Sequence, residues 1–333
     1  MKTEILEKRY YLFKQIDTIL LFMLIFSYAY FFVYIIPWVD IVGKDFSDIK
    51  NYMERIEYLR QGLPEREFSG IGVLFSEYLW KYISIAIGKF FNDYRAGLYI
   101  VSFLSVSLYS FFTFRRVNII LVSILLITPM FIDLVLGQLR MSIAFPLLLM
   151  GYELRDRKIF FIPILIAIFI HSASFIFIAI FFILKYMEKE FLLENLYRNS
   201  MILAFLMAFF MKYGVDIILI AVGSPKANYN SIIEATSISY SLIWFFLALV
   251  LVIKAPIEDV KERVIISFSI TMMSFFFFAS IFGVYGQRYV AISIPLIIIS
   301  INYLPKHYKQ AIFLTFLLYQ FLQFKYWFGT ILI

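Results

Sequence analysis

The chain has 333 residues, of which 62% are hydrophobic and 16% charged, with a formal net charge of +7 and no cysteine. Several uncharged runs are long enough to cross a bilayer, so the composition excludes a soluble globular domain and predicts a single, all-helical integral membrane domain over residues 1–333. The basic residues lie mainly in short loops, so topology accounts for the net charge and nucleic acid is not expected as a partner. The lack of cysteine excludes disulfides and thiolate chemistry.

The first apolar run, 18–36, follows a basic N-terminus. It is too long for the apolar core of a signal peptide and has no cleavage site of small residues, so it predicts a retained span. The polar stretch that follows predicts an outer loop, 37–95, with amphipathic or re-entrant helices. One helix is indicated by apolar residues at helical spacing, namely Ile49, Tyr52, Met53, Ile56 and Leu59. A second is indicated over 68–91, where Glu77, Lys81 and Lys89 interrupt an apolar run.

Two later stretches are each too long for one crossing. Residues 117–152 carry only Asp133 and Arg140 as charges, and residues 264–305 carry only Arg288. At ~1.5 Å per residue they would form helices of roughly 54 and 63 Å. The bilayer core is only ~30 Å thick, so each stretch predicts a helical hairpin. The expected turns are at Gly137-Gln138 and between Gly283 and Gln287, which places Arg140 and Arg288 near the turns.

Clusters of lysine and arginine in short loops mark the cytoplasmic side. Each hairpin lies between two such clusters, so Arg140 and Arg288 are expected on the outer side. The same parity requires that one of the apolar segments 18–36, 68–91 and 96–114 does not cross, and the charges in 68–91 indicate that it is this one. The parity also requires either that 159–184 breaks at His171-Ser172 or that 199–222 falls short of a full crossing. We favour the break, because small polar residues follow His171, and it brings His171 toward the outside. In total about 10–11 transmembrane helices are expected.

The two arginines are the strongest candidates for binding. Two guanidiniums at the outer edge can clamp a diphosphate, with Gln138 and Gln287 beside them. The alternative is that each arginine reaches toward lipid headgroups or pairs locally, Arg140 with Asp133 for example. The segments Gly-Gln-Leu-Arg and Gly-Gln-Arg, each followed by apolar residues and a proline, are either an ancient internal repeat of the transporter kind or a coincidence.

One histidine and three outer carboxylates are candidates for catalysis. His171 lies in a nearly apolar context and can act as a general base, or it can be a structural histidine bonded to carbonyls at a helix break. Asp45, Asp48 and Glu77 can supply carboxylate chemistry, or they can lie on the solvated faces of amphipathic helices. The histidines and carboxylates have no ligand spacing, so neither a metal nor a cofactor is expected.

Four short motifs resemble those of the EpsG-like, Wzy-type polysaccharide polymerases. Residues 137–144 are similar to a Q-x-R-x-x-x-A segment, and 169–174 to an F/H-x-S-A step. Residues 43–52 resemble a G-x-D-x-x-x-Y outer loop, and 77–80 a helix that begins with glutamate and carries an aromatic residue. The resemblance covers residues 18 to 305.

The resemblance implies a metal-independent membrane glycosyltransferase with GT-C-like architecture, like that of the O-antigen ligases. Such an enzyme joins oligosaccharide repeat units carried on undecaprenyl diphosphate, at the outer face of the bacterial cytoplasmic membrane, to make O-antigen, exopolysaccharide or capsule. Donor and acceptor would be lipid-linked oligosaccharides, and membrane lipids and a chain-length regulator are further expected partners. The diphosphate would meet the arginines, while His171 or an outer carboxylate such as Asp45 would take the proton.

Two other functions stay open. A transporter or flippase of lipid-linked glycans would suit an internal repeat around the two arginines. A membrane O-acyltransferase would also use an intramembrane histidine, but the His-Asn or His-Asp constellation usual for that chemistry is not recognisable.

Overall fold

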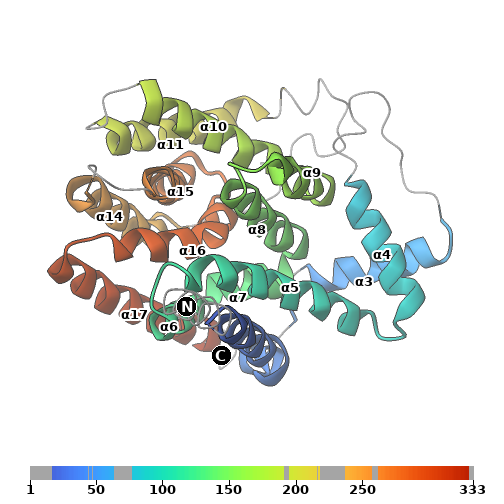
Figure 1. Ribbon diagram of the computed structural model, residues 1–333. Helices are drawn as coiled ribbons and strands as arrows, with labels where there is room; N and C mark the ends of the chain where they lie inside the picture. Colours follow the sequence, from blue (N-terminus) through green and yellow to red (C-terminus); the bar gives the residue numbers. More distant parts are fainter. Residues whose placement is uncertain are drawn as a thin grey trace, which may run out of the picture.

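The computed structural model describes residues 17–43, 45–46, 48–63, 77–190, 195–215, 217, 237–256 and 262–329, with side chains to 325. All regular structure within these ranges is helical, which confirms the all-helical class (Figure 1). In chain order the helices are Asp17–Ile35, which ends in the π-helical turn η1 (Phe31–Ile35), α2 (Trp38–Val42), α3 (Ile49–Arg60), α4 (Tyr78–Phe90), α5 (Tyr94–Phe114), α6 (Ile119–Leu126), α7 (Pro129–Gly137), α8 (Leu139–Glu153), η3 (Lys158–Phe160), α9 (Phe161–Ile170), α10 (Ser174–Glu190), α11 (Leu196–Tyr213), α14 (Ile238–Lys254), α15 (Arg263–Phe282), α16 (Gln287–Asn302) and α17 (Lys306–Gly329).

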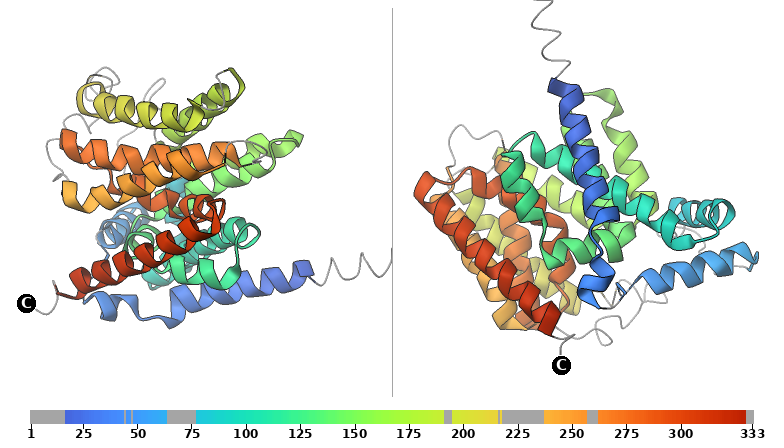
Figure 2. Two further views of the ribbon diagram at one scale, coloured as in Figure 1. Left: turned by 90° about the vertical axis from the view of Figure 1, so that its left-hand side faces the viewer. Right: turned by 90° about the horizontal axis from the view of Figure 1, so that it is seen from below.

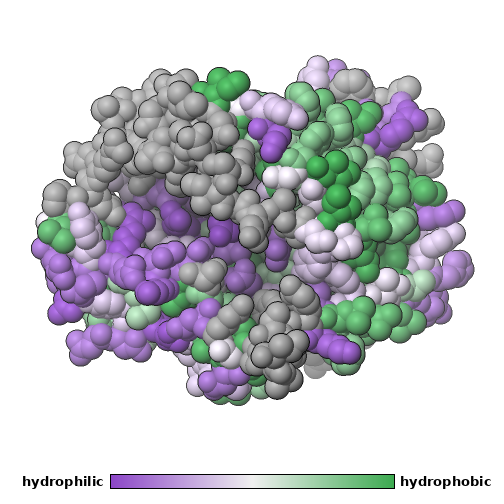
Figure 3. Space-filling view, turned by 180° about the vertical axis from the view of Figure 1, so that it is seen from behind, coloured by the Kyte–Doolittle hydropathy of each residue, from purple (hydrophilic) through white to green (hydrophobic). Residues whose placement is uncertain are grey.

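Three of the described helices are long and apolar enough to cross a membrane, namely Asp17–Ile35, α5 and α15. The pair α6 and α7, bent by 76° at its break, would add a fourth if it is one broken span. The first helix lies at the edge of the bundle (Figure 2), and its Ile19, Phe22 and Met23 are 42–62% exposed, as expected for side chains that face lipid. Figure 3 shows a band of hydrophobic residues between hydrophilic residues at the two ends of the molecule.

The core of the bundle is built around α15, which packs against α10, α11, α14 and α16. Figure 2 (left) shows the helices as stacked layers, from α10 and α11 through α14 and α15 to α17 and the first helix. The hairpin predicted over 264–305 is present as α15 and α16. Its turn begins at Gly283, which has φ +68°, a left-handed conformation that glycine adopts without steric cost.

The stretch 117–152 turns where predicted, since α7 ends at Gly137 and α8 begins at Leu139. It differs from a simple hairpin because α6 and α7 are separated by a break at Ile127-Thr128. Local chemistry explains the break. Thr128 Oγ1 accepts a hydrogen bond from the Phe131 amide at 3.1 Å, and Pro129, which has no N–H, occupies the first position of α7.

The loops expected in the cytoplasm meet at one end of the bundle. Arg116 after α5 pairs with Glu153 of α8 and, at 3.1 Å, with Glu262 before α15. Its carbonyl accepts a hydrogen bond from Asn302 at 3.3 Å, and Asn302 in turn accepts one from Lys309 at 2.9 Å. These contacts join the loops as the parity argument expects. The first residues of α8 and α16 are therefore at the opposite end.

The amphipathic helix expected in the outer loop is α3, whose buried residues Ile49, Tyr52, Ile56 and Leu59 follow helical spacing. Helix α4 packs against it, and the two helices lie side by side at one end of the bundle, where α4 also contacts α5 and α9 (Figure 1). Residues 68–76 of the second predicted amphipathic segment lie outside the described residues. The described part of 37–95 thus forms a two-helix cap at the end of the bundle that holds the starts of α8 and α16.

Candidate functional site

Glu77, the residue that precedes α4, lies at the centre of a polar cluster. Its side chain is 7% exposed, and its Oε2 pairs with Nη1 of Arg140 at the start of α8. Its Oε1 lies 2.7 Å from His171 Nδ1. The Ser172 amide and hydroxyl also donate to Oε1, at 3.3 and 3.4 Å. Three segments that are far apart in the chain therefore converge on one buried carboxylate.

The backbone of Glu77 is strained. Its φ of +52° and ψ of +45° are left-handed, and no other non-glycine residue in the described ranges has a positive φ. Such a conformation costs an L-residue about 1–2 kcal/mol. Because a glycine at this position would avoid that cost, the strain indicates that the carboxylate is needed where it is.

His171 occupies the break that the sequence predicts within 159–184. Helix α9 ends at Ile170, His171 is extended with φ −148°, and α10 begins at Ser174. The Ala167 carbonyl accepts from the His171 amide at 2.9 Å and also from Ser174 Oγ at 3.0 Å, so both sides of the break are tied to the last turn of α9. An ionised Glu77 carboxylate can only accept a hydrogen bond, so next to it a neutral His171 ring would carry its proton on Nδ1 and leave Nε2 as the basic nitrogen.

The ion-pair partner of Arg140 is not Asp133, the local partner considered from the sequence. Asp133 Oδ2 instead accepts a hydrogen bond from Gln138 Nε2 at 2.8 Å. The guanidinium of Arg140 pairs with Glu77 and lies 5.7 Å from the centre of the Tyr52 ring. Burial raises the pKa of Tyr52, while Arg140 opposes the rise, so the ring stays neutral at physiological pH.

Arg288 contacts the residue that precedes α3, one helical turn before Tyr52. Its Nη2 lies 3.5 Å from Oδ2 of Asp48. The Asp48 carbonyl accepts from the Tyr52 amide at 3.0 Å, so the two residues are one helical turn apart. Arg140 therefore contacts the first turn of α3, at Tyr52, and Arg288 contacts Asp48, the residue that precedes the helix. The two arginines, 148 positions apart in the chain, share the capped end of the bundle.

Each arginine occupies the second position of its helix. Neither α8 nor α16 has a side chain that caps its first turn. A cation there opposes the helix dipole at a cost of about 0.3–1 kcal/mol, whereas an anion is favoured. A guanidinium beside uncapped backbone amides is therefore suited to an anionic ligand that contacts both.

The other predicted site residues are placed differently. Asp45 pairs with Arg95 at 2.6 Å in a partly exposed contact, and no contact joins Asp45 to the Glu77 cluster within the described ranges. Gln138 is 5% exposed, and its Oε1 has no hydrogen-bond partner among the described residues. Gln287 is the half-buried first residue of α16, next to Arg288. In the same ranges no group of three or more His, Asp or Glu side chains could hold a metal ion.

Sequence reasoning did not find the partners of the two arginines. From the sequence, Glu77 and Asp48 are candidates for carboxylate chemistry or for solvated helix faces, but neither is matched to an arginine. One available signal was that Glu77 is followed by a largely apolar helix, where a carboxylate needs a cationic partner. Ser172 was noted only as a helix breaker, whereas its amide and hydroxyl contact the carboxylate.

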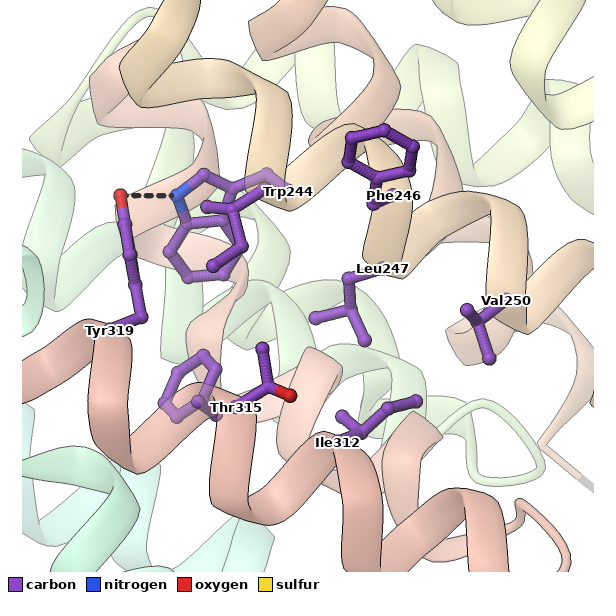
Figure 4. A pocket seen from close by; sticks show the side chains of 9 residues that line it. Trp244, Phe246, Leu247, Val250, Ile312, Thr315 and Tyr319 are labelled. Carbon is purple, nitrogen blue, oxygen red and sulfur yellow. Dashed lines mark hydrogen bonds between the residues drawn. The ribbon is translucent and has the colours of Figure 1, made fainter.

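A cavity of about 150 Å³ lies between α14 and α17 (Figure 4). Its walls are apolar apart from Thr315 and the hydrogen bond from Trp244 Nε1 to the Tyr319 hydroxyl, 3.1 Å long. It holds no charged group, so it does not suit acid–base chemistry or anion binding, and we interpret it as a packing gap between two helices.

Comparisons with protein-family models, with curated proteins and with solved structures found no match for this chain.

Proposed function

We propose that the chain is a membrane glycosyltransferase that polymerises oligosaccharide repeat units carried on undecaprenyl diphosphate, at the extracytoplasmic face of the bacterial cytoplasmic membrane. The observation that carries the proposal is the convergence of Arg140, Glu77 and His171, with Arg288 paired to Asp48 just before α3, the helix that Arg140 also contacts. The finer expectations of about 10–11 spans and a GT-C-like architecture belong to this proposal.

In the proposed reaction, a hydroxyl oxygen of the acceptor attacks the anomeric carbon of the donor sugar. The bond from that carbon to the diphosphate oxygen breaks, and its electron pair leaves with the diphosphate. Nε2 of His171 takes the proton of the attacking hydroxyl, while Glu77 holds the ring through Nδ1 and stabilises the imidazolium that forms. Arg140 and Arg288 stabilise the charge that develops on the leaving diphosphate. The reaction needs no further reactant.

The test supplies the purified protein with lipid-linked repeat units and looks for a ladder of polymer. Arg140→Gln should reduce the rate by about 10²–10³, the usual effect of removing one donor that stabilises a developing charge. The matched control is Arg155→Gln, which removes the same charge just after the other end of α8, where Arg155 is exposed and stacks on Tyr152 at 4.4 Å. A full ladder from Arg140→Gln, with normal folding, would refute the proposal.

One observation supports a second candidate, a transporter or flippase of lipid-linked glycans. Helices α8 and α16 both carry arginine at their second position and a proline inside, Pro146 and Pro295, as repeated elements of a transporter would. Gene disruption separates the two functions. Loss of a polymerase leaves single repeat units on the cell surface, whereas loss of a flippase leaves none outside.

A further inference from the structure

An open groove of about 440 Å³ runs between α4 and α9. Tyr78 and Tyr82 line it from α4, and Leu165, Ile166 and Phe169 line it from α9. Almost all of its exposed lining is apolar, and its volume lies within the ~300–1,000 Å³ typical of ligand sites. Tyr82 is 64% exposed and Leu165 45%, so the groove opens at the surface of the bundle.

The groove leads to the polar cluster. Helix α4 begins directly after Glu77, and α9 ends at Ile170, directly before His171. The lining residues nearest to these ends are Tyr78 and Phe169, one and two positions from the polar residues. Since both walls lead to the carboxylate that Arg140 and His171 contact, one end of the groove lies beside the candidate site. The other end lies about two helical turns away along α9.

We propose that this groove holds the first isoprenoid units of the lipid carrier whose diphosphate is bound at Arg140 and Arg288; the inference rests on the proposed function. The occupant must have an apolar chain joined directly to an anionic head, because the groove residues Tyr78 and Phe169 lie one and two positions in the chain from residues that contact Arg140 or its carboxylate partner. The tyrosines at Tyr78 and Tyr82 fit this arrangement, since tyrosine favours the boundary between a membrane and water.

The groove would orient the carrier chain rather than add binding energy through hydrophobic burial. A carrier chain in a bilayer already has an apolar environment, so moving it into a protein groove removes little apolar surface from water. What the groove supplies is a fixed direction for the chain. The head group is then held with its anomeric carbon at one place relative to His171, which lowers the entropic cost of reaching the reactive geometry.

The experiment measures the affinity of the full-length protein in nanodiscs for two probes, a polyprenyl diphosphate and inorganic pyrophosphate. Ile166→Trp, which fills the groove, should weaken polyprenyl diphosphate binding at least about tenfold, because the indole occupies the path of the chain while the head is bound, and it should leave pyrophosphate binding unchanged. Ile202→Trp is the matched control, because Ile202 lies on α11 outside the groove and is 53% exposed. Equal affinity of Ile166→Trp and Ile202→Trp for polyprenyl diphosphate would overturn the inference.

Arg140→Gln separates this failure from failure of the proposed function. It should weaken binding of both probes, and if it weakens neither, the proposed diphosphate site is wrong. A labelling experiment on the unsubstituted protein tests the groove without any variant. A polyprenyl diphosphate with a photoreactive group in its first isoprene units should label residues 162–169, and unlabelled polyprenyl diphosphate should compete. Labelling outside residues 162–169 would contradict the inference. Equal competition by phosphatidylglycerol would show that the groove holds only bulk lipid.

Discussion

Replacing Glu77 with glutamine tests the centre of the site. The substitution keeps the side-chain volume and removes the charge that pairs with Arg140. Removing one partner of a buried ion pair costs about 3–5 kcal/mol, because the other charge is left uncompensated. Glu77 is 7% exposed but Arg140 is 28% exposed, so water recovers part of that loss. Discounting for this screening, we expect Glu77→Gln to lower the free energy of unfolding by roughly 2–3 kcal/mol.

A double-mutant cycle isolates the pair. The free energy of unfolding in detergent is measured for the unsubstituted protein, Glu77→Gln, Arg140→Gln and the double variant, by denaturant titration. We expect a coupling energy of about 1–3 kcal/mol. The matched control is the cycle of Asp45→Asn with Arg95→Gln, whose side chains are 47% and 31% exposed and should couple by less than about 1 kcal/mol. If the effects of Glu77→Gln and Arg140→Gln add to within about 0.5 kcal/mol, the ion pair does not hold the site together.

Three further predictions follow from single contacts. His171→Gln should lower the rate of polymerisation by roughly 10²–10⁴, measured as ladder formation, with a free energy of unfolding close to that of the unsubstituted protein. Gln320→Leu removes the hydrogen bond of 2.9 Å to the Leu125 carbonyl at the α6–α7 break and should cost about 1–3 kcal/mol in the same detergent titration. Asp48→Asn removes a carboxylate that competes for Arg288 and should strengthen pyrophosphate binding several-fold; weaker binding would contradict that competition.

The turns and the break were predictable because their signals are local. Gly137 and Gly283 follow apolar helices at points where the helix would otherwise exceed the bilayer, and glycine is the residue that ends a helix most easily. At His171 a polar residue followed by small ones interrupts an apolar run, and the helix ends there. The break at Thr128 was equally local, but Thr-Pro as a helix start was overlooked inside an apolar stretch.

The pairings could not be predicted in the same way. Glu77 and Arg140 are 63 positions apart, and Asp45 and Arg95 are 50 positions apart. Helical spacing and hydropathy state which face of a helix is buried, but not which carboxylate will meet which guanidinium across separate elements. The number of crossings between the basic loops was enough to predict that Arg140 and Arg288 lie at the same end of the bundle. Their partners depend on how α3 and α4 fold back over that end.

The charge balance of the site connects binding to proton transfer. Within the described part of the chain, Arg140 pairs with Glu77 and Arg288 pairs with Asp48, so a diphosphate must compete with these two carboxylates for the guanidiniums. When His171 takes a proton, it becomes a second cation on Glu77 and competes with Arg140 for the same carboxylate. In the proposed reaction, Arg140 is then better able to pair with the departing diphosphate. If the proposal holds, proton uptake at His171 and charge stabilisation at Arg140 reinforce one another through Glu77, the one buried carboxylate that contacts both.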